Sequence, residues 1–289
     1  MGSAVPREFP LPAPPWTLGC GETILSPAMR SFRLTLSYDG TAYVGWQVQD
    51  NGRTIQAELE AALLRVTGQA VRAAASGRTD AGVHALGQVV SFRCETRLTA
   101  DVLRRALDAN LPRDIVVREV REAPDGFHAI RDALRKRYRY VVQDGPIRDV
   151  FGRAYSWYYA QRLDVEAMHA AAQTLVGKHD FRSFEAAGSP RVSSVRTIFE
   201  LTVQRHGGER EGVSPPADGE FLDRVSVEVE ADGFLYNMVR NLVGSLVEVG
   251  SGRREVAWMA EVLAARDRKL AGMTAPPQGL FLVSVDYGW

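Results

Sequence analysis

The chain has 289 residues, of which 45% are hydrophobic and 24% are charged, and both fractions are those of a globular protein. Its 35 Lys and Arg residues balance its 35 Asp and Glu residues, so the formal net charge is zero. This balance excludes a non-specific polyanion binder, because that kind of affinity grows with the number of phosphates that are neutralised. A nucleic-acid-binding protein of this composition must carry a local basic patch.

The amino-terminal stretch has prolines at positions 6, 10, 12, 14, 15 and 27 and lacks the apolar core of a signal peptide. We predict that residues 1–30 are a disordered extension and that Met29 is a candidate start. Apolar runs all fall short of the ~18 residues of a membrane span, so we expect no membrane partner. The cysteines, Cys20 and Cys94, form neither a CxxC pair nor a metal-spaced set, which favours a reduced, cytoplasmic protein over a disulfide.

Regular patterns begin after this extension. Phe32, Leu34 and Leu36 alternate with polar residues, which predicts a strand. The patterns that follow predict a helix over 54–66, a strand over 87–92, a helix over 99–110 and a strand over 115–120. Strands and helices thus intermix across the first half of the chain.

The second half follows a similar order. Its patterns predict a strand over 136–142, a helix over 164–176, paired strands over 195–204 and 223–231, helices over 234–249 and 255–266, and a closing strand over 280–287. The segment between the paired strands, at about 206–220, is rich in Gly, Glu and Pro and is expected to be a mobile surface insert. We therefore predict an α+β fold. Two pseudo-symmetric mixed α/β halves, 31–130 and 131–289, would carry antiparallel sheets flanked by helices around a central basic cleft.

The stretch SGRTDAGVHA precedes the second of these strands and is chemically the most unusual part of the chain. Gly77 and Gly82 allow backbone shapes or close approaches that other residues cannot adopt. Between them, Asp80 beside Arg78 would stay ionised, because a nearby cation favours the carboxylate, and would serve as a nucleophile or base. The alternative is an ordinary β-turn. His84 is read as a structural histidine.

A basic strand begins at Arg135 with the sequence RKRYRY. Alternation along a strand places Arg137 and Arg139 on one face and Tyr138 and Tyr140 on the other. Tyrosine rings can stack on an extruded base and guanidinium groups can contact phosphates, so this is the candidate basic patch. The alternative is an amphipathic strand with its tyrosines in the core and its arginines in water.

The predicted helix over 234–249 has a broad apolar face and a narrow polar stripe of Asn237, Arg240, Asn241 and Gly244. Arg240 is either a solvated edge residue or a cation delivered to the cleft. In the second case it would supply a counter-charge for the carboxylate described above.

Motifs for common cofactors are missing from the sequence. It contains neither GxxxxGK[ST] nor a GxGxxG that opens a helix, and no HExxH, while its five histidines are scattered. We expect no cofactor and no metal site.

Several stretches together resemble the TruA family of tRNA pseudouridine synthases. They are YDGTAYVGWQVQ at 38–49, GRTDAGVHA at 77–85, KRYRY at 136–140 and FLYNMVRNLVG at 234–244, with weaker echoes in GKHDFRSF at 177–184 and GLFLVSVDY at 279–287. The resemblance runs from about residue 32 to the carboxyl terminus. It does not include the amino-terminal extension or the insert.

The resemblance implies roles for five residues. Asp80 matches the catalytic aspartate, and Arg78 matches the arginine that helps to hold the target nucleotide out of its stack. Tyr138 matches the tyrosine that packs on the flipped uracil and takes the C5 proton. Arg240 matches the basic partner of the aspartate, and Leu280 matches a pocket leucine.

The activity implied by the resemblance is isomerisation of uridine to pseudouridine at positions 38–40 of tRNA, on the 3′ side of the anticodon stem-loop. It proceeds by base flipping and an aspartate-dependent exchange of the C1′–N1 bond for a C1′–C5 bond, in a homodimer that needs no cofactor. Michael addition, an acylal and a glycal route all stay open. Rival hypotheses are a non-catalytic RNA chaperone, a metal-dependent nuclease built on Asp80 and His84, and a structural dimer module.

Overall fold

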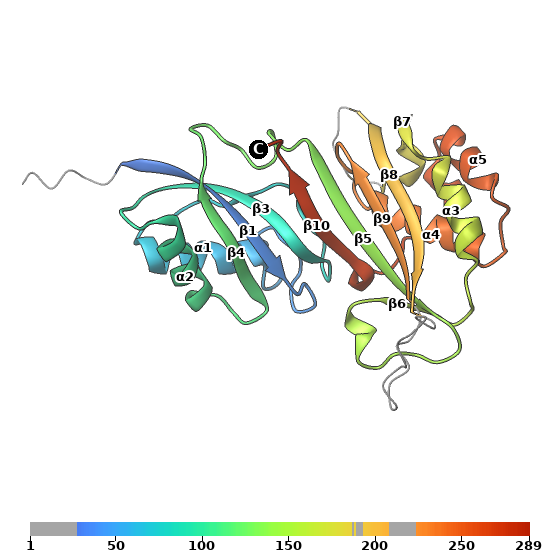
Figure 1. Cartoon of the computed structure of the whole chain (residues 1–289), viewed down its shortest axis with the longest axis horizontal. Helices are drawn as coiled ribbons and strands as arrows, with labels where there is room; N and C mark the ends of the chain where they lie inside the picture. The colour runs from blue at the N-terminus through green and yellow to red at the C-terminus, as the bar shows by residue number, and fades with distance from the viewer. Residues whose placement is uncertain (1–27, 187, 189–192, 208–223) are drawn as a thin grey trace, which may run out of the picture.

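A computed structural model describes residues 28–186, 188, 193–207 and 224–289. In the described residues, ten strands join in a single, mostly antiparallel sheet, shown in Figure 1. Its main path, in spatial order, is β4 (Ile115–Glu122), β1 (Met29–Tyr38), β3 (His84–Glu95), β10 (Leu280–Asp286), β5 (Arg135–Asp144), β9 (Arg224–Ala231), β8 (Val195–His206) and β7 (Gly177–Asp180). Two short strands lie off this path: β2 (Ala74–Ala75) pairs with β3, and β6 (Trp157–Tyr159) pairs with β5.

The last strand of the chain joins the two halves. β10 pairs antiparallel with β5 and parallel with β3, where Phe281 lies opposite His84 and Leu282 opposite Ala85. Parallel strands begin at the same edge of a sheet. The loop that leads into β3 and the segment that leads into β10 therefore meet at one place, on the line between the halves.

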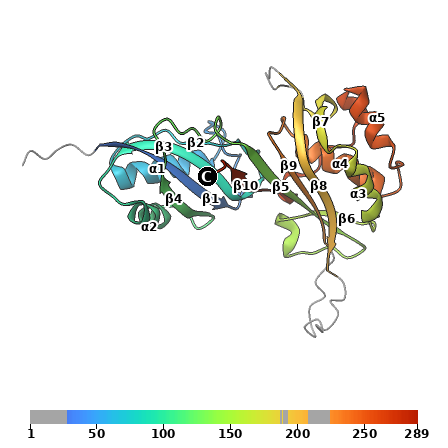
Figure 2. The ribbon, with the colours of Figure 1, turned by 45° about the horizontal axis from the view of Figure 1, so that its top comes forward.

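In the described residues, five α-helices accompany this sheet, and α5 packs against α3. α1 (Ile55–Thr67) and α2 (Ala100–Asn110) lie on the amino-terminal strands, and α3 (Val165–Gln173), α4 (Met238–Gly250) and α5 (Trp258–Ala265) lie with the carboxyl-terminal ones, as Figures 1 and 2 show. Apolar side chains from both halves, such as Phe32 and Tyr140, belong to one buried cluster. The mixed α/β fold that the sequence predicts is confirmed, with the refinement that the two halves share one sheet.

Capping residues explain where the first helices begin. Thr54 accepts a hydrogen bond from the backbone N–H of Ala57, and Thr99 accepts one from Val102. α1 ends at Gly68, whose φ of 72° is left-handed, as the sequence pattern predicts. No helix in the described part of the chain combines the length and the apolar character that crossing a membrane requires.

The structure assigns to strands some residues that were predicted to lie in the amino-terminal extension or in the insert. Met29 and Arg30, assigned to the extension, belong to β1 and pair with Glu95 and Cys94 of β3. His206, assigned to the insert, ends β8 and bonds to Ser226. Backbone pairing extended these strands beyond the alternating apolar residues. The remainder of the two predictions, with Cys20, falls on residues 1–27 and 208–223, which lie outside the described residues.

Three helices are shorter than predicted. α4 begins at Met238 and not at 234, because Asn237 has a left-handed φ of 57° and the preceding residues form a turn. Phe234 and Leu235 fit the apolar period of the helix, yet they belong to this turn. The ring of Phe234 packs edge-on against that of Tyr138, with ring centroids 5.0 Å apart. Turns likewise replace the predicted helix over 174–176 and over 255–257.

Candidate active site

A pocket of about 520 Å³ lies where the loop into β3 meets the segment before β10. Its lining comes from the loop after β1, the loop before β3, the start of α4 and the segment before β10. These residues are Val44, Gln47, Gln49, Arg78, Thr79, Asp80, Ala81, Tyr236, Arg240 and Pro277. Three of the predicted site residues, Asp80, Arg78 and Arg240, are thereby brought together from distant parts of the sequence.

The backbone around Asp80 is held against the loop that follows β1. Asp80 forms an isolated antiparallel bridge with Gly45, and the N–H of Trp46 donates to the carbonyl of Thr79 at 3.0 Å. A side chain at Gly45 would lie 2.8 Å from the Thr79 carbonyl oxygen, and Gly45 also has a φ of +113°. Only glycine fits this close approach without strain.

The glycine prediction for the Asp80 loop is half confirmed. Gly82 has a φ of +75°, and its N–H donates to the carbonyl of Tyr43. Gly77 has no left-handed φ, and a Cβ there would approach only the flexible end of Lys136. The loop therefore requires glycine after the aspartate and not before it.

Buried hydrogen bonds fix the other end of the loop. The hydroxyls of Tyr38 and Thr79 bond at 2.8 Å, and the side chain of Gln88 donates to the carbonyl of Gly77 at 2.7 Å. Both Tyr38 and Gln88 are buried strand residues. Because its backbone is tied on both sides, the loop holds the Asp80 carboxylate in a defined place.

The Asp80 carboxylate faces a single guanidinium. Its Oδ2 lies 3.7 Å from Nη1 of Arg240, with side-chain exposures of 35% and 15%. This separation is too long for a good hydrogen bond but short enough for a strong charge interaction. Burial raises the pKa of Asp80 above its ordinary value, and Arg240 offsets part of that rise. A neighbouring cation does favour the charged form, as the sequence predicts, although it comes from Arg240 and desolvation acts on the pKa more strongly.

Two neutral oxygens hold Arg240. Its Nε donates to the carbonyl of Ala275 at 2.6 Å, and its Nη1 donates to Oδ1 of Asn237 at 3.0 Å. The polar stripe of α4 therefore has two parts. Arg240 lines the pocket and Asn237 bonds to it. Asn241 accepts bonds from Thr274 and Arg268 and so holds the segment that leads to β10.

Arg78 occupies the exposed rim of the pocket and makes no ion pair with any other described residue. Its guanidinium is therefore available to an incoming anion or base. Tyr138 is buried beside the pocket without lining it, and burial, Tyr38 and the Asp80 charge all raise its pKa. Leu280 is also buried outside the lining and lies opposite Tyr140 in the sheet.

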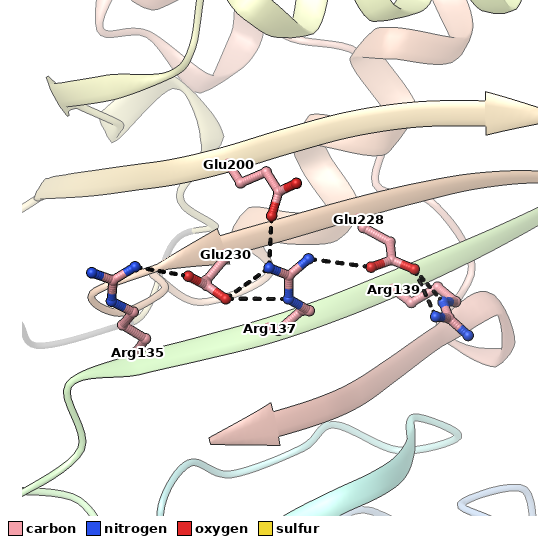
Figure 3. Close-up of polar contacts among 6 residues, drawn as sticks. All are labelled: Arg135, Arg137, Arg139, Glu200, Glu228 and Glu230. Carbon is pink, nitrogen blue, oxygen red and sulfur yellow. Dashed lines mark hydrogen bonds and ion pairs between the residues drawn. The ribbon is translucent and has the colours of Figure 1, made fainter. Parts of the chain in front are cut away.

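Arg137 and Arg139 project from the opposite face of β5, and Figure 3 shows their partners. Arg137 bonds to Glu200, Glu228 and Glu230, with N–O distances of 2.6, 3.4 and 2.9 Å. Arg139 pairs with Glu228 at 2.7 Å. The predicted alternation along the strand is confirmed, but it takes these two arginines away from the pocket.

His84 has a structural setting, as the sequence analysis expected. It is buried, its Nδ1 accepts from the N–H of Gly40 at 3.1 Å, and its Nε2 lies 3.0 Å from the carbonyl oxygen of Ala154. Burial is the largest influence on its pKa, which is lowered, so the neutral form is favoured. His84 thus ties the Asp80 loop to the carboxyl-terminal half. In the described residues, no group of three or more His, Cys, Asp or Glu side chains has the geometry to hold a metal ion.

Tyr236 and Pro277 line the pocket but were not singled out by sequence reasoning. Tyr236 lies inside the motif at 234–244. It belongs to the turn before α4, which the apolar period had predicted to be helical. Pro277 comes directly before the closing strand, and its place depends on the parallel pairing of β10 with β3. The motif at 234–244 was a clue to Tyr236, whereas no pattern in the sequence indicated that Pro277 would line the pocket.

The chain is similar to known proteins over most of its length. The family model described as tRNA pseudouridine synthase matches residues 35–131 and 171–288. A protein of Moorella thermoacetica named tRNA pseudouridine synthase A is 48% identical over 261 residues, covering 90% of this chain and 100% of that protein. Proteins of the same name from Brevibacillus brevis and Thermoanaerobacter sp. (strain X514) are 45% and 41% identical, each over 259 residues, 90% of this chain and 100% of the relative. The chain belongs to the tRNA pseudouridine synthase family.

Proposed function

We propose that this protein isomerises uridine to pseudouridine in tRNA, with Asp80 as the catalytic carboxylate. One observation carries the proposal beyond family membership. Asp80 lies in a pocket of about 520 Å³, opposite Arg240 and beside Arg78, which makes no ion pair with another described residue. A pocket of this size suits a single nucleotide that has been taken out of its stack.

The reaction breaks the C1′–N1 bond of uridine, turns the uracil and joins its C5 to C1′. Substrate and product have the same atoms, so the protein has to supply binding, orientation and proton transfer. Extruding the nucleotide costs a few kcal/mol of stacking and pairing. We assign Arg78, on the rim, to fill the vacated space and to contact the RNA.

Asp80 acts in its ionised form. It adds to C1′ or to the base, or it removes the C2′ proton to give a glycal, and every one of these routes requires a carboxylate. Partial burial makes the charge more reactive, because fewer water molecules solvate it. Arg240 stabilises the charge from 3.7 Å without a direct hydrogen bond that would occupy the oxygen lone pairs.

Tyr138 is assigned to the uracil. Its raised pKa favours the neutral phenol, so its ring offers a packing surface and its hydroxyl exchanges protons without passing through a stable phenolate. In this role the hydroxyl accepts the C5 proton while it gives its own proton to a neighbouring group. Asp80, whose charge acts on Tyr138, is a candidate acceptor. Leu280 would close the apolar side of the base.

The finer features of the proposal follow from the family resemblance. The target uridines are those at positions 38–40 of the anticodon arm, the protein works as a homodimer, and it acts in the cytoplasm. Arg137 and Arg139 would contact phosphates only by exchanging their glutamate partners for RNA.

The decisive experiment uses an unmodified tRNA transcript and the purified full-length protein, in parallel reactions with Mg²⁺ and with EDTA. Pseudouridine is mapped by carbodiimide treatment and primer-extension stops. New stops in the anticodon arm are expected. Binding without new stops would favour the RNA chaperone, and shortened RNA that disappears with EDTA would favour the nuclease; either result would overturn the proposal.

A further inference from the structure

Asn237 has an unusual backbone for its place in the fold. It is the residue before the first turn of α4, where asparagine normally has an extended backbone and accepts a hydrogen bond from a helix N–H. Here φ is 57°, in the left-handed region, and the side chain makes no capping bond. Among the described residues, Arg266 is the other non-glycine residue with a left-handed φ. Helix capping therefore does not explain Asn237.

The side chain of Asn237 instead bonds to Arg240. Its Oδ1 accepts from Nη1 at 3.0 Å, and this is the same nitrogen that lies 3.7 Å from Oδ2 of Asp80. The carbonyl of Ala275 holds Nε of Arg240 at 2.6 Å. A guanidinium without these bonds could donate two hydrogen bonds to the Asp80 carboxylate, as in a bidentate ion pair. Here the Ala275 carbonyl and the Asn237 Oδ1 accept hydrogen bonds from two of its nitrogens.

We propose that Asn237 is a positioning residue that holds the Arg240 guanidinium at a fixed distance from Asp80. At this distance the guanidinium stabilises the carboxylate charge but does not occupy its oxygens with hydrogen bonds. Without Asn237, Arg240 would close on Asp80 and form a tight ion pair that is less reactive toward the substrate. The inference rests on the proposed function for its catalytic consequence, but the geometry itself can be tested separately.

The charged and titratable groups around Asp80 come from four parts of the fold. Arg78 lies on its own loop, Arg240 on α4, and the hydroxyl of Tyr138 on β5, while Tyr236 lines the pocket from the turn before α4. Arg240 is the cation that lowers the pKa of Asp80 against the effect of burial. A change in the Arg240–Asp80 distance must therefore change that pKa.

Two substitutions distinguish the role of the Asn237 side-chain oxygen from that of its left-handed backbone. Asn237→Gly keeps the left-handed backbone and removes the acceptor, because glycine adopts this φ readily. Asn237→Asp keeps the acceptor and adds a second carboxylate that competes for Arg240. Arg266→Gly is the matched control: it removes a side chain from the other left-handed residue, which has a φ of 53° and does not line the pocket.

The first readout is the pKa of Asp80, followed by carbon-13 NMR of labelled aspartate carboxyls and assigned with Asp80→Asn. We expect this pKa to fall in Asn237→Gly, to rise in Asn237→Asp and to stay unchanged in Arg266→Gly. The second readout is the single-turnover rate on tRNA, which should fall about 10- to 100-fold in both Asn237 variants with Kd for tRNA within about twofold.

An unchanged Asp80 pKa in both Asn237 variants would overturn the positioning role, and so would shifts of the same sign in both. Failure of the wild-type protein to form pseudouridine would instead overturn the proposed function. In that event the NMR titration still decides the positioning role. A rate loss that merely follows the urea unfolding midpoint, with no pKa shift, would mark Asn237 as structural.

Discussion

The two faces of β5 use one short basic stretch for different purposes. On one face, Tyr138 and Tyr140 are buried next to the pocket and the segment that leads to β10. On the other face, Arg137 and Arg139 lie in a row of ion pairs with glutamates of β8 and β9, as Figure 3 shows. Strand alternation alone produces this separation.

The comparison teaches that a basic stretch in a sequence is not yet a basic surface. The glutamates that neutralise Arg137 follow it in the chain by 63 to 93 residues and reach it only through sheet pairing. The cations of the pocket come from elsewhere, on the loop before β3 and on α4. Substitutions on the pocket face should therefore change the chemistry, and those on the paired face should change stability.

The largest effect is expected from Asp80→Asn. Removal of the carboxylate should lower the single-turnover rate by at least about 10⁴-fold, as for other essential catalytic groups. The Kd for tRNA, from filter binding, should stay within about twofold. The variant should also unfold at the same or a higher urea concentration, because burial makes the Asp80 charge unfavourable at neutral pH. Loss of tRNA binding would instead identify a structural aspartate.

Arg240→Met should have the next largest effect. The substitution keeps an unbranched side chain but removes the cation that lowers the pKa of Asp80. We expect the single-turnover rate at neutral pH to fall by about 10²- to 10³-fold, as for the loss of one strong electrostatic contact. Arg240→Lys, which restores the charge, should recover part of this loss. If Arg240→Met and Arg240→Lys had equal rates, the charge at this position would have no role in the chemistry.

Tyr138→Phe should lower the rate by about 10²-fold, the lower end of the range for acid–base catalysis. The ring and its packing against Phe234 are retained, so tRNA binding and the urea midpoint should change little. Release of tritium from uridine labelled at C5 is the direct measurement. Full activity in this variant would exclude Tyr138 from proton transfer.

Arg137→Gln, on the paired face, should change the single-turnover rate by less than about threefold. It should instead lower the free energy of unfolding by about 1–2 kcal/mol in urea, because three carboxylates lose a partially buried partner. Arg139→Gln, which removes a pair with Glu228 alone, is the milder control. If Arg137→Gln lowered the slope of the logarithm of the tRNA binding constant against the logarithm of the salt concentration by about one, Arg137 would be shown to contact a phosphate.

Much of the fold could be predicted because local signals agreed with tertiary packing. Thr54 and Gly68 mark the ends of α1, and the alternation in β1 and β5 describes their faces correctly. The chain could not show that β10 joins both halves, since strand order depends on contacts between distant residues. The short strands β2, β6 and β7 were missed because two to four residues carry no period.

The candidate site was predictable where its chemistry is concentrated in motifs. Asp80 and Arg78 stood out by residue type, whereas Arg240 stayed open between two interpretations until the family resemblance assigned it; the structure places all three around one pocket. The direction of the pKa shift of Asp80 was not predictable, because it depends on how deeply the loop is buried. Asn237 appeared only as part of a polar stripe, since its left-handed backbone leaves no pattern in the sequence.

The pH dependence of the single-turnover rate in wild type and Arg240→Met tests the role of Asp80 most directly. Only the carboxylate is reactive, so activity must be lost as the pH falls through the pKa of Asp80 in the folded protein. That pKa lies above the ordinary 3.8, because burial outweighs Arg240. We predict an acid limb above 3.8 that moves to still higher pH in Arg240→Met. A limb at or below 3.8, or one that is identical in both proteins, would contradict the assignment.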